Sequence, residues 1–444
     1  MKKDYRSPLQ RFKARRPLSV TNLISPSWCE QQYEYNLSNY GRIPKTKAMS
    51  AGSSLHKELE EQVHVEVPVE VVSREDRMGL RLWNTIQGLR ALRTTGLTRE
   101  LEVWAVVEGE VVNGILDEVT VECPDVEMEG RMLRQQESGG DGEKGGKGKK
   151  EPQLAPDQRT LTDFFTNPAR GGSTLESQSS SFLDAIHKSS EPSTEKTAAT
   201  TYYLKDIKTT SRPRPPTQPA YTRSAHLQLM LYHRILSSLT ANEVPAQKVF
   251  ARYGLNPEAD FSDKFIAELA NLDVRAYASV PDEVMEDEGD LPLSQRRGER
   301  DPLTELLERK NLGLLWGLLV EELQRTFVSP PAKADNTGAS KVTTDANPSI
   351  SPLLTVEYRS PSSANDQLIG NLSFPLSRPQ LDAYVRDEIS WWRGERETVG
   401  VSVDEAWKCG WCEFREGCTW RKTKVEEGLE RVRMRREGAV RSEV

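Results

Sequence analysis

The sequence predicts an α/β fold in which a mixed central sheet is flanked by helices. Residues 101–107 and 111–121 are rich in β-branched and apolar residues on either side of a turn at Gly109, as expected for a β-hairpin. Further strands are expected at 202–209, 354–358 and 367–374. Stretches with helical spacing of apolar residues separate these strands, which is typical of a sheet covered by helices.

Size and charge exclude several classes of protein. The 444 residues, 36% of them hydrophobic, suffice for one large domain or two ordinary ones. The net charge of -7 argues against a uniformly basic nucleic-acid binder, although residues 1–20 hold seven Lys or Arg and one acid. No apolar run approaches the length of a membrane span and no secretory signal core is present, so we expect a protein that does not enter a membrane. We also expect a monomer.

Composition divides the chain into seven segments. We expect the main domain to be interrupted by two inserts, because the composition around GGDGEKGGKGKK cannot bury a core. The segments are a disordered basic segment at 1–20, the first part of the domain at 21–123, a disordered insert at 124–200, the second part at 201–328, a low-complexity insert at 329–352, the C-terminal part at 353–420 and a basic tail at 421–444.

Helices are expected between and after these strands. Pro26 suits the first turn of one that begins near Ser25. In SAGSSLHKELEEQV, Gly52, His56 and Glu60 are each four residues apart and share a face. Further helices are expected near 78–92, over AYTRSAHLQLMLYHRIL, near 302–327 and over 379–396.

The segment TYYLKDIKTT carries the strongest chemical signal. Side chains alternate along a strand, so Asp206 and Lys208 share a face while Ile207 is buried behind them. Asp117 lies on a strand that can pair beside this one, because the segment between them is an insert. Two carboxylates with open positions suit Mg²⁺ or Mn²⁺, and a lysine can orient water or offset charge on a phosphate. The alternative is a structural ion pair on an exposed strand face, which a lone D-x-K motif favours.

The order of the motifs narrows this choice. G-x3-H-x3-E, an isolated Asp, D-x-K and then Q-x3-Y resembles the RecB-type branch of the PD-(D/E)xK nucleases, which implies a restriction-endonuclease-like core. The resemblance implies metal ligation by His56, Asp117, Asp206 and the Ile207 carbonyl. It also implies that Lys208 is catalytic, that Gln228 and Tyr232 support the site and the DNA backbone, and that Glu60 stands behind the ligands.

Four of the five cysteines form a second pattern. Cys409-x2-Cys412-x5-Cys418 supplies three thiolates, and Cys29 is a better fourth ligand than Cys123, which adjoins the insert and is expected to be free. Four thiolates hold a tetrahedral zinc or a 4Fe–4S cluster, and the spacing does not separate the two. Trp28, Trp411 and Trp420 are placed to shield such a site or simply to pack in the core.

The chain as a whole resembles the eukaryotic exonuclease V family, also called the defects-in-morphology family. The segments that carry the resemblance are SVTNLISPSWCEQQYEY, LKDIKTT, HLQLMLYHRIL, WWRGERE and EAWKCGWCEF. The resemblance implies degradation of single-stranded DNA from an end, with Mg²⁺ or Mn²⁺ and an iron–sulfur cluster that staples the chain ends around the sheet. Members of this family occur in the nucleus and in mitochondria. The basic segment at 1–20 fits a mitochondrial presequence, a nuclear signal or a plain tail.

Two surface features indicate partners. Arg212, Arg214 and Arg223 follow the catalytic strand and are candidates for phosphate contacts, although each alone fits an ordinary surface charge. Within the first insert, QRTLTDFF matches the Q-x-x-L-x-x-F-F pattern of sliding-clamp (PCNA) ligands. The matching residues are Gln158, Leu161, Phe164 and Phe165.

A second function from another class remains open. A zinc-stapled, clamp-recruited DNA-binding adaptor with an inactive nuclease fold would keep the cysteines and the clamp peptide. Intact Asp117, Asp206 and Lys208 favour the enzyme.

Overall fold

The computed structural model describes eight stretches of the chain. They are residues 6–12, 17–40, 47–62, 69–139, 200–269, 302–328, 349–360 and 368–442. Residues 1–130 and 199–444 form one compact unit, and residues 131–198 form a second. No described helix is both long and apolar enough to cross a bilayer.

The helices and strands follow each other in a mixed order. They are α1 (Pro8–Arg11), β1 (Leu18–Ser19), α2 (Val20–Ile24), η1 (Ser25–Ser27), α3 (Glu30–Tyr40), α4 (Lys47–Glu61), α5 (Arg74–Thr95), β2 (Leu97–Val107), β3 (Glu110–Thr120), α6 (Val126–Gly139), β4 (Tyr202–Thr209), α8 (Pro219–Thr240), α9 (Ala246–Tyr253), α11 (Pro302–Glu308), α12 (Leu312–Phe327), β5 (Ile350–Arg359), β6 (Leu368–Pro375), α13 (Arg378–Arg393), η5 (Val403–Trp411) and α14 (Thr419–Ser442). The two η elements are 3₁₀ helices.

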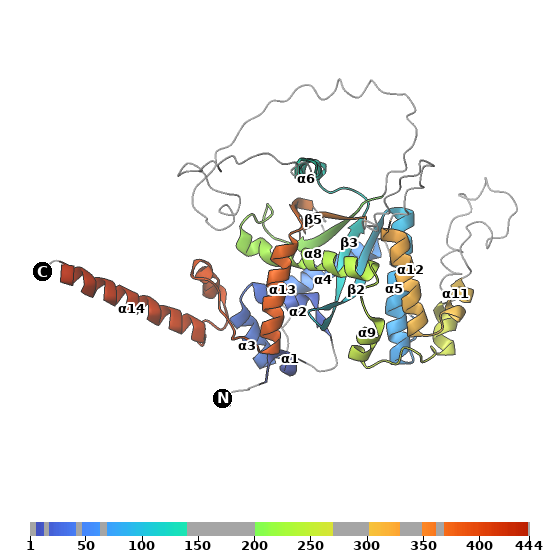
Figure 1. Cartoon of the computed structure of the whole chain (residues 1–444), viewed down its shortest axis with the longest axis horizontal. Coiled ribbons are helices and arrows are strands. Elements are labelled where there is room, and N and C mark those ends of the chain that lie inside the picture. Colours follow the sequence, from blue (N-terminus) through green and yellow to red (C-terminus); the bar gives the residue numbers. More distant parts are fainter. Residues whose placement is uncertain are drawn as a thin grey trace, which may run out of the picture. The chain divides into compact units, whose positions relative to one another are not determined.

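The six strands form one mixed sheet, which branches at β3. β2 pairs antiparallel with one edge of β3 along its length. The other edge is shared, because β1 pairs parallel with Val112 and Asn113, whereas β4 pairs antiparallel with residues 118–120. β5 then runs parallel to β4, and β6 antiparallel to β5. The predicted mixed sheet is confirmed, and Figure 1 shows it among its helices.

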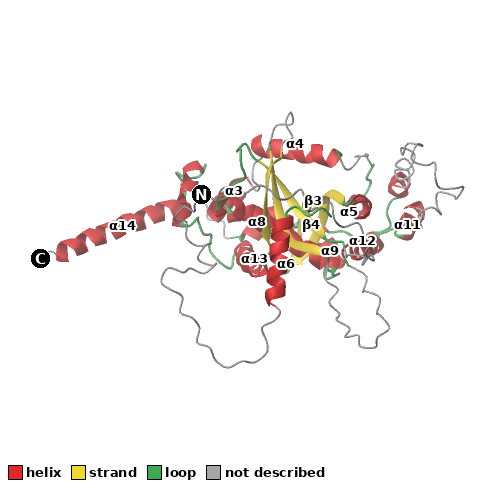
Figure 2. Cartoon of the chain, turned by 90° about the horizontal axis from the view of Figure 1, so that it is seen from above, coloured by secondary structure: helices red, strands yellow, loops and turns green. Residues whose placement is uncertain are grey.

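Helices cover both faces of the sheet. Figure 2 shows α4 on one side of the strands and α8 and α13 on the other. Under α4, Leu55 and Leu59 pack on Ile207 of β4 in a small separate cluster. The larger core lies on the α8 side, where α8 buries its apolar residues from Ala225 to Leu239. The predicted helical layers are therefore present. Strand β4 lies between α4, which precedes it in the chain, and α8, which follows it.

Local signals explain how the hairpin is set. Helix α5 ends at Gly96, whose φ of 77° is left-handed, and the chain passes directly into β2. The β2–β3 turn consists of Glu108 and Gly109, which both have positive φ, as a type I′ turn requires. A two-residue turn fixes the register of the two strands, and this register decides which side chains face each other further along.

One expected helix is in fact two. The segment near 302–327 was expected to be a single helix, but α11 ends at Glu308 and α12 begins at Leu312. Asn311 causes the break, because its side chain accepts a hydrogen bond from the Leu314 N–H at 2.9 Å and so caps α12.

The basic N-terminal segment is structured where it is described. The expectation of disorder over 1–20 is wrong for residues 6–12 and 17–20. Ser7 caps α1, and Arg11 binds Glu34 at 2.8 Å and Ser38 at 2.7 Å on α3. Leu18 is buried in β1 beside β3. The basic composition of this segment suggested disorder, but one of its cations, Arg11, binds residues of α3.

Described elements extend into both of the expected inserts. Val126–Gly139 form α6, so the disorder expected from residue 124 is wrong at its start, while residues 140–199 lie outside the described residues. The second insert, expected to end at 352, gives way to β5, since Ile350 already pairs with Tyr202. Most of the basic tail expected at 421–444 belongs to α14, which is largely exposed.

Candidate active site

Strands β3 and β4 separate at the candidate active site. Their last paired residues are Glu118 and Lys205, and beyond them β4 continues beside β5 alone. Asp117 and Asp206 are the first residues past this rung. The Ile207 N–H has no β3 backbone partner there and donates instead to Asp117 Oδ2 at 2.7 Å. The strand fork therefore brings two carboxylates from distant parts of the chain to one place.

Asp206 and Lys208 form a tight pair on β4, as the alternation of side chains predicts. Lys208 Nζ lies 2.8 Å from Asp206 Oδ1. Asp206 is 1% exposed, and its Oδ2 is buried without a hydrogen-bond donor among the described residues. Burial and the nearby Asp117 charge raise the pKa of Asp206 to about 7, although Lys208 opposes them. Two carboxylates this close disfavour each other's ionisation, so a cation in addition to Lys208 would stabilise the site.

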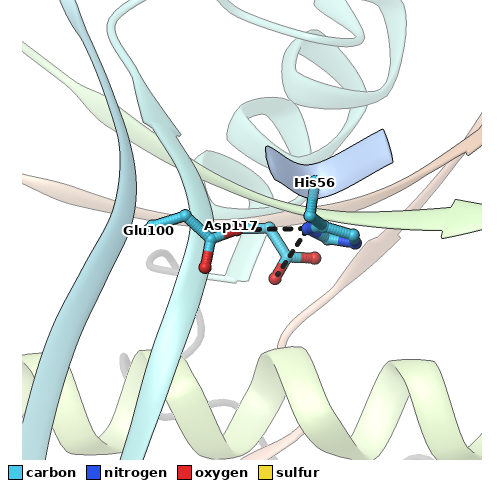
Figure 3. Close-up of side chains that lie close together, drawn as sticks. All are labelled: His56, Glu100 and Asp117. Atoms are coloured by element: carbon cyan, nitrogen blue, oxygen red, sulfur yellow. Dashed lines mark hydrogen bonds and ion pairs between the residues drawn. The ribbon is translucent and has the colours of Figure 1, made fainter. Parts of the chain in front are cut away.

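His56 also lies at the fork, beside Ile207 and Asp117. It comes from α4, which covers the face of the sheet opposite to α8. Its Nε2 lies 3.1 Å from the Ile207 carbonyl oxygen, and its Nδ1 lies 3.1 Å from Glu100 Oε1 and 3.9 Å from Asp117 Oδ1. Figure 3 shows the three side chains turned toward one another. The hydrogen bond to Glu100, with help from the Asp117 charge, raises the pKa of His56 despite its burial.

Glu100 is a site residue that the sequence interpretation missed. Its neighbours on β2, Arg99 and Leu101, pair with Glu118 and Leu116 on β3. Glu100 therefore lies opposite Asp117 in this strand pair. Its φ of 50° is left-handed, which is uncommon for a residue with a long side chain. The signal that could have found it is the two-residue turn, because counting back from that turn places Glu100 opposite Asp117.

These groups fit a divalent cation. Ligand atoms of His56, Glu100 and Asp117 lie within 4.8 Å of one another. The Ile207 carbonyl adjoins His56, and the unpartnered Asp206 oxygen is a further donor close to Asp117. Carboxylate, carbonyl and imidazole donors with room for water are suited to Mg²⁺ or Mn²⁺.

Gln228 and Tyr232 lie on α8, behind the fork. Tyr232 is buried, and its hydroxyl lies next to the Gln228 side chain and the Ile115 backbone. Burial, followed by the charges of Asp117 and Asp206, raises the pKa of Tyr232. A Cβ on Gly114 would come within 2.5 Å of Tyr232 Cε1, so a glycine is needed for this ring to approach β3. Tyr232 thus supports the strand from inside, and its ring is not open to a DNA backbone.

Glu60 lies one helical turn after His56 on α4 and is half buried. It follows Leu59, whose carbonyl accepts a hydrogen bond from Arg99 Nη1 at 2.7 Å. Arg99 also contacts Glu118 on the last rung before the fork. This bond ties the end of α4 to the strands and so fixes the helix that carries His56.

The four predicted cysteine ligands line one pocket. Cys29, Cys409, Cys412 and Cys418 all face it, and all five cysteines of the chain are free thiols. Burial, and then the neighbouring Cys412 and Cys409, raise the pKa of Cys29. Cys123 is elsewhere, beside Glu129 and Tyr203. The structure thus brings together the set chosen from the sequence.

The tryptophans predicted to shield this pocket divide into two kinds. Trp28 and Trp420 line it. Trp411 does not shield it, because its side chain is 87% exposed.

Comparison with known proteins decides the family. The family model described as "Exonuclease V - a 5' deoxyribonuclease" matches residues 7–421. The chain belongs to the exonuclease V family. It is therefore a DNA exonuclease, with DNA as its partner.

Curated exonuclease V proteins resemble this chain over different lengths. "Exonuclease V" of Danio rerio is 22% identical over 422 residues, which cover 94% of this chain and 73% of that protein. "Exonuclease V, mitochondrial" of Candida glabrata is 24% identical over 443 residues, covering 92% of this chain and 80% of that protein. "Exonuclease V, mitochondrial" of Candida albicans is 38% identical over 95 residues, covering 21% and 14%.

The three arginines that were expected to contact DNA have different surroundings. Arg212 is exposed and lies over the Tyr221 ring, with Cζ 4.6 Å from the ring centroid. Arg214 is exposed. Arg223 instead pairs with Glu405, with its Nη2 2.5 Å from Oε1. The predicted clamp-binding residues Gln158, Leu161, Phe164 and Phe165 lie outside the described residues.

Proposed function

We propose that this protein is a metal-dependent enzyme that degrades single-stranded DNA from its 5′ end. The observation that carries the proposal is the strand fork, where Asp117, Asp206 and Lys208 meet beside His56. The 5′ direction follows the description of the family. We assign catalytic roles to Asp117, Asp206 and Lys208, and supporting roles to Gln228 and Tyr232.

His56, Asp117, Asp206 and the Ile207 carbonyl would hold the Mg²⁺ or Mn²⁺ ion, and Glu100 joins them. When bound, the ion polarises the phosphodiester and lowers the pKa of a coordinated water. Glu100 orients the His56 ring by its bond to Nδ1. Asp206 keeps the Lys208 ammonium at the fork, where it can orient the attacking water and offset charge that develops on the phosphate. The Asp206 charge, with that of Asp117, keeps the pKa of Lys208 raised even though burial lowers it, so the lysine remains a cation.

The activity test uses one strand labelled at either end. Wild-type protein with Mg²⁺ should release the 5′ label of a single strand first, leave a circular single strand intact and spare a blunt duplex. Lys208→Ala and Asp206→Ala should each lower the rate at least about 100-fold, the loss typical of removing a group that stabilises transition-state charge. Equal activity of wild type and Asp206→Ala would refute the site. Absence of cleavage by both, with DNA still bound, would favour the inactive adaptor.

We also propose that Cys29, Cys409, Cys412 and Cys418 hold a 4Fe–4S cluster that joins the N-terminal part of the fold to its C-terminal loop. The proposal is supported by the pocket that these four cysteines line, because four thiolates can hold a zinc ion or a 4Fe–4S cluster. The resemblance to iron–sulfur nucleases, in which one cysteine precedes the nuclease core and three follow it, favours the cluster.

Metal analysis of anaerobically purified protein tests the cluster. We expect a brown protein with about four iron and four sulfide per chain, and loss of colour in Cys29→Ser with the chain still soluble. One zinc per chain and a colourless protein would refute the cluster and leave the nuclease proposal standing.

The cellular setting is proposed on separate grounds. The Candida relatives are named mitochondrial, and we propose a mitochondrial location for this chain, with the nucleus as the alternative if the clamp peptide is used. Because Leu18 is buried in β1, removal of residues 1–20 on import would remove strand β1 from the sheet. Imaging of a C-terminally tagged chain, and N-terminal sequencing of the imported protein, would test both points.

Recruitment by a sliding clamp is the last part of the proposal. Residues 158–165 keep the Q-x-x-L-x-x-F-F spacing, in which the leucine and the aromatic pair enter one apolar pocket. A peptide of this sequence should bind a purified clamp, and the peptide with Phe164→Ala and Phe165→Ala should not. Equal binding of both peptides would refute the recruitment.

A further inference from the structure

Three rings that contact one another lie between the end of β4 and the cysteine pocket, and the ring centroids of Trp28 and Tyr221 are 6.1 Å apart. The Arg212 guanidinium stacks on Tyr221, the Tyr221 ring centroid is 5.1 Å from that of Trp407, and the Trp407 ring is 5.8 Å from that of Trp28. Trp28 itself lines the cysteine pocket. We call Arg212, Tyr221, Trp407 and Trp28 the aromatic platform.

The aromatic platform is partly open to solvent, mainly at Trp407 and Arg212. Trp407 is 39% exposed and Arg212 is exposed, while Tyr221 and Trp28 are half buried. The partly exposed Trp407 indole contacts the Tyr221 ring that carries the Arg212 guanidinium, so exposed apolar surface and positive charge lie close together. Such a surface suits a ligand that has both flat rings and phosphates.

The surroundings hold the platform in place before any ligand binds. The Lys408 ammonium lies 4.1 Å from the centroid of the Trp28 ring and donates to the Trp28 carbonyl at 3.0 Å. Lys408 is 3% exposed and is paired with Glu405. The loop after Arg212 contains Pro213, Pro215 and Pro216, which restrict its backbone. Little conformational freedom remains to be lost on binding, which favours affinity.

The platform is connected to the active site through two elements. Arg212 follows Lys208 by four residues in the chain, just beyond the end of β4. Tyr221 lies in the first turn of α8, the helix that also carries Gln228 and Tyr232. A DNA strand lying on the platform would therefore be held by the same elements that build the fork.

We infer that the aromatic platform binds the bases of single-stranded DNA by stacking and helps to select single strands. Bases of an unpaired strand offer their faces, whereas those of a duplex are already stacked on each other. The inference rests on the proposed single-strand activity and adds the residues that recognise the strand. The plain alternative is that these rings only fill the space between α8 and η5.

Binding of DNA strands with and without bases distinguishes base stacking on the platform from simple packing of its rings. The full-length holoprotein, in buffer without Mg²⁺ or Mn²⁺, is titrated into a labelled oligothymidylate and into an abasic deoxyribose-phosphate strand of equal length and charge. Trp407→Ala should weaken oligothymidylate binding about tenfold, as expected for the loss of one stacked base, and leave the abasic strand unaffected. Trp407→Phe should stay within about threefold of wild type because it keeps a ring.

Two further variants make the result specific. Trp411→Ala is the matched control, since Trp411 lies on the same 3₁₀ helix and is exposed, and none of the ring contacts of the platform involves it. It should bind both strands like wild type. Arg212→Lys keeps the charge but loses the planar group, so it should weaken only the strand with bases, and it serves if Trp407→Ala fails to fold.

The outcomes are distinct. Equal losses on both strands, no loss on either, or a Trp411→Ala variant that matches Trp407→Ala would overturn the platform. A wild-type protein that binds a duplex as tightly as a single strand would instead contradict the proposed single-strand specificity. In that case, the comparison of oligothymidylate with the abasic strand still decides whether the platform stacks bases.

Discussion

The Ile207 N–H donates a hydrogen bond to Asp117 Oδ2 at 2.7 Å, at the point where β3 stops pairing with β4. A side chain thus takes the place of a backbone acceptor at the fork. The same bond holds the Asp117 carboxylate against β4, next to Asp206. One hydrogen bond therefore ends the sheet ladder and positions a proposed metal ligand.

Replacing Asp117 should separate these two roles. Asp117→Asn keeps an oxygen that accepts from Ile207, so the midpoint of thermal unfolding should stay near that of wild type while nuclease activity falls at least about 100-fold. Asp117→Ala should lose activity equally and also lose about 1–3 kcal/mol of unfolding free energy, because the Ile207 N–H loses its partner. Denaturant unfolding and end-labelled digestion measure both. An active Asp117→Asn protein would contradict the assignment of Asp117 as a ligand.

The raised pKa values at the fork predict how stability depends on pH. Asp206 has a pKa of about 7, above its value of about 3.9 in an unfolded chain, so the folded state keeps a proton that the unfolded state has released. Without metal, the free energy of unfolding should fall as pH rises from about 4 to 7, by at most about 4 kcal/mol. His56, whose pKa is also raised, adds stability that is present below about pH 6.5 and lost as pH rises through its folded pKa.

Metal should reverse this trend. A cation replaces the protons of His56 and Asp206, so Mg²⁺ affinity and nuclease activity should rise with pH through about 7. Urea unfolding at pH 5, 6, 7 and 8, with and without Mg²⁺, measures the effect, and Asp206→Asn should flatten the metal-free slope between pH 4 and 7. A slope unchanged in Asp206→Asn would show that other groups cause it.

Gly114→Ala should damage the support behind the fork. The new Cβ would meet Tyr232 Cε1 at 2.5 Å and Val20 Cγ2 at 2.8 Å, so the ring has to move and the fold should lose about 1–3 kcal/mol. Activity should fall with it, since Tyr232 packs beside the fork. Gly317→Ala on α12 is the control, because its Cβ meets nothing within 4 Å and alanine favours a helix by up to about 1 kcal/mol. A Gly114→Ala protein as stable and active as wild type would refute this role of Tyr232.

The Arg223–Glu405–Lys408 group should matter for stability through its buried member. Glu405→Ala leaves the buried Lys408 ammonium without its carboxylate, which should remove about 3–5 kcal/mol of unfolding free energy. Arg223→Ala should remove at most about 1 kcal/mol, because the Arg223 side chain is 40% exposed and Lys408 keeps its partner. We expect Arg223→Ala to bind single-stranded DNA like wild type, since its guanidinium is engaged by Glu405. A loss of affinity that shrinks with added salt would instead return Arg223 to the DNA contacts.

Local patterns predicted the parts of this fold that depend on neighbours in sequence. The strand at 202–209 has the predicted limits, because a β-branched and aromatic run bounded by polar loops has few alternatives. The cysteines at 409, 412 and 418 share a pocket with Cys29, as their spacing and chemistry suggested. Asp117 and Asp206 are adjacent for the reason given from the sequence, namely that an insert separates two pairing strands.

The parts that sequence reasoning missed depend on contacts between distant segments. Basic residues in 1–20 gave no sign that Arg11 binds Glu34 and Ser38 or that Leu18 joins the sheet. The aromatic platform joins residues 28, 212, 221 and 407, which no local pattern connects. Composition was also a poor guide at 126–139, where a polar segment forms α6.

Glu100 provides a sharp test, because its backbone conformation lowers the stability of the fold whereas its side chain contributes a bond to the proposed metal site. The left-handed φ of 50° disfavours any residue with a Cβ by roughly 1 kcal/mol, whereas the carboxylate bonds to His56. Glu100→Gly should therefore raise the free energy of unfolding in metal-free buffer by up to about 1 kcal/mol while lowering Mg²⁺ affinity and activity about tenfold or more. Isothermal titration with Mg²⁺, denaturant unfolding and strand digestion measure the three effects.

Glu108→Gly is the matched control for this prediction. Glu108 has a φ of 46° in the turn of the same hairpin, and no ligand atom of the proposed metal site comes from it. The control should gain stability to a similar degree and keep full Mg²⁺ affinity and activity. If both variants gained stability and kept activity, Glu100 would be a strained residue without a role at the metal site. If Glu100→Gly lost stability in metal-free buffer, its bond to His56 would outweigh the strain, and the left-handed backbone would not be the opposing term that we assign to it.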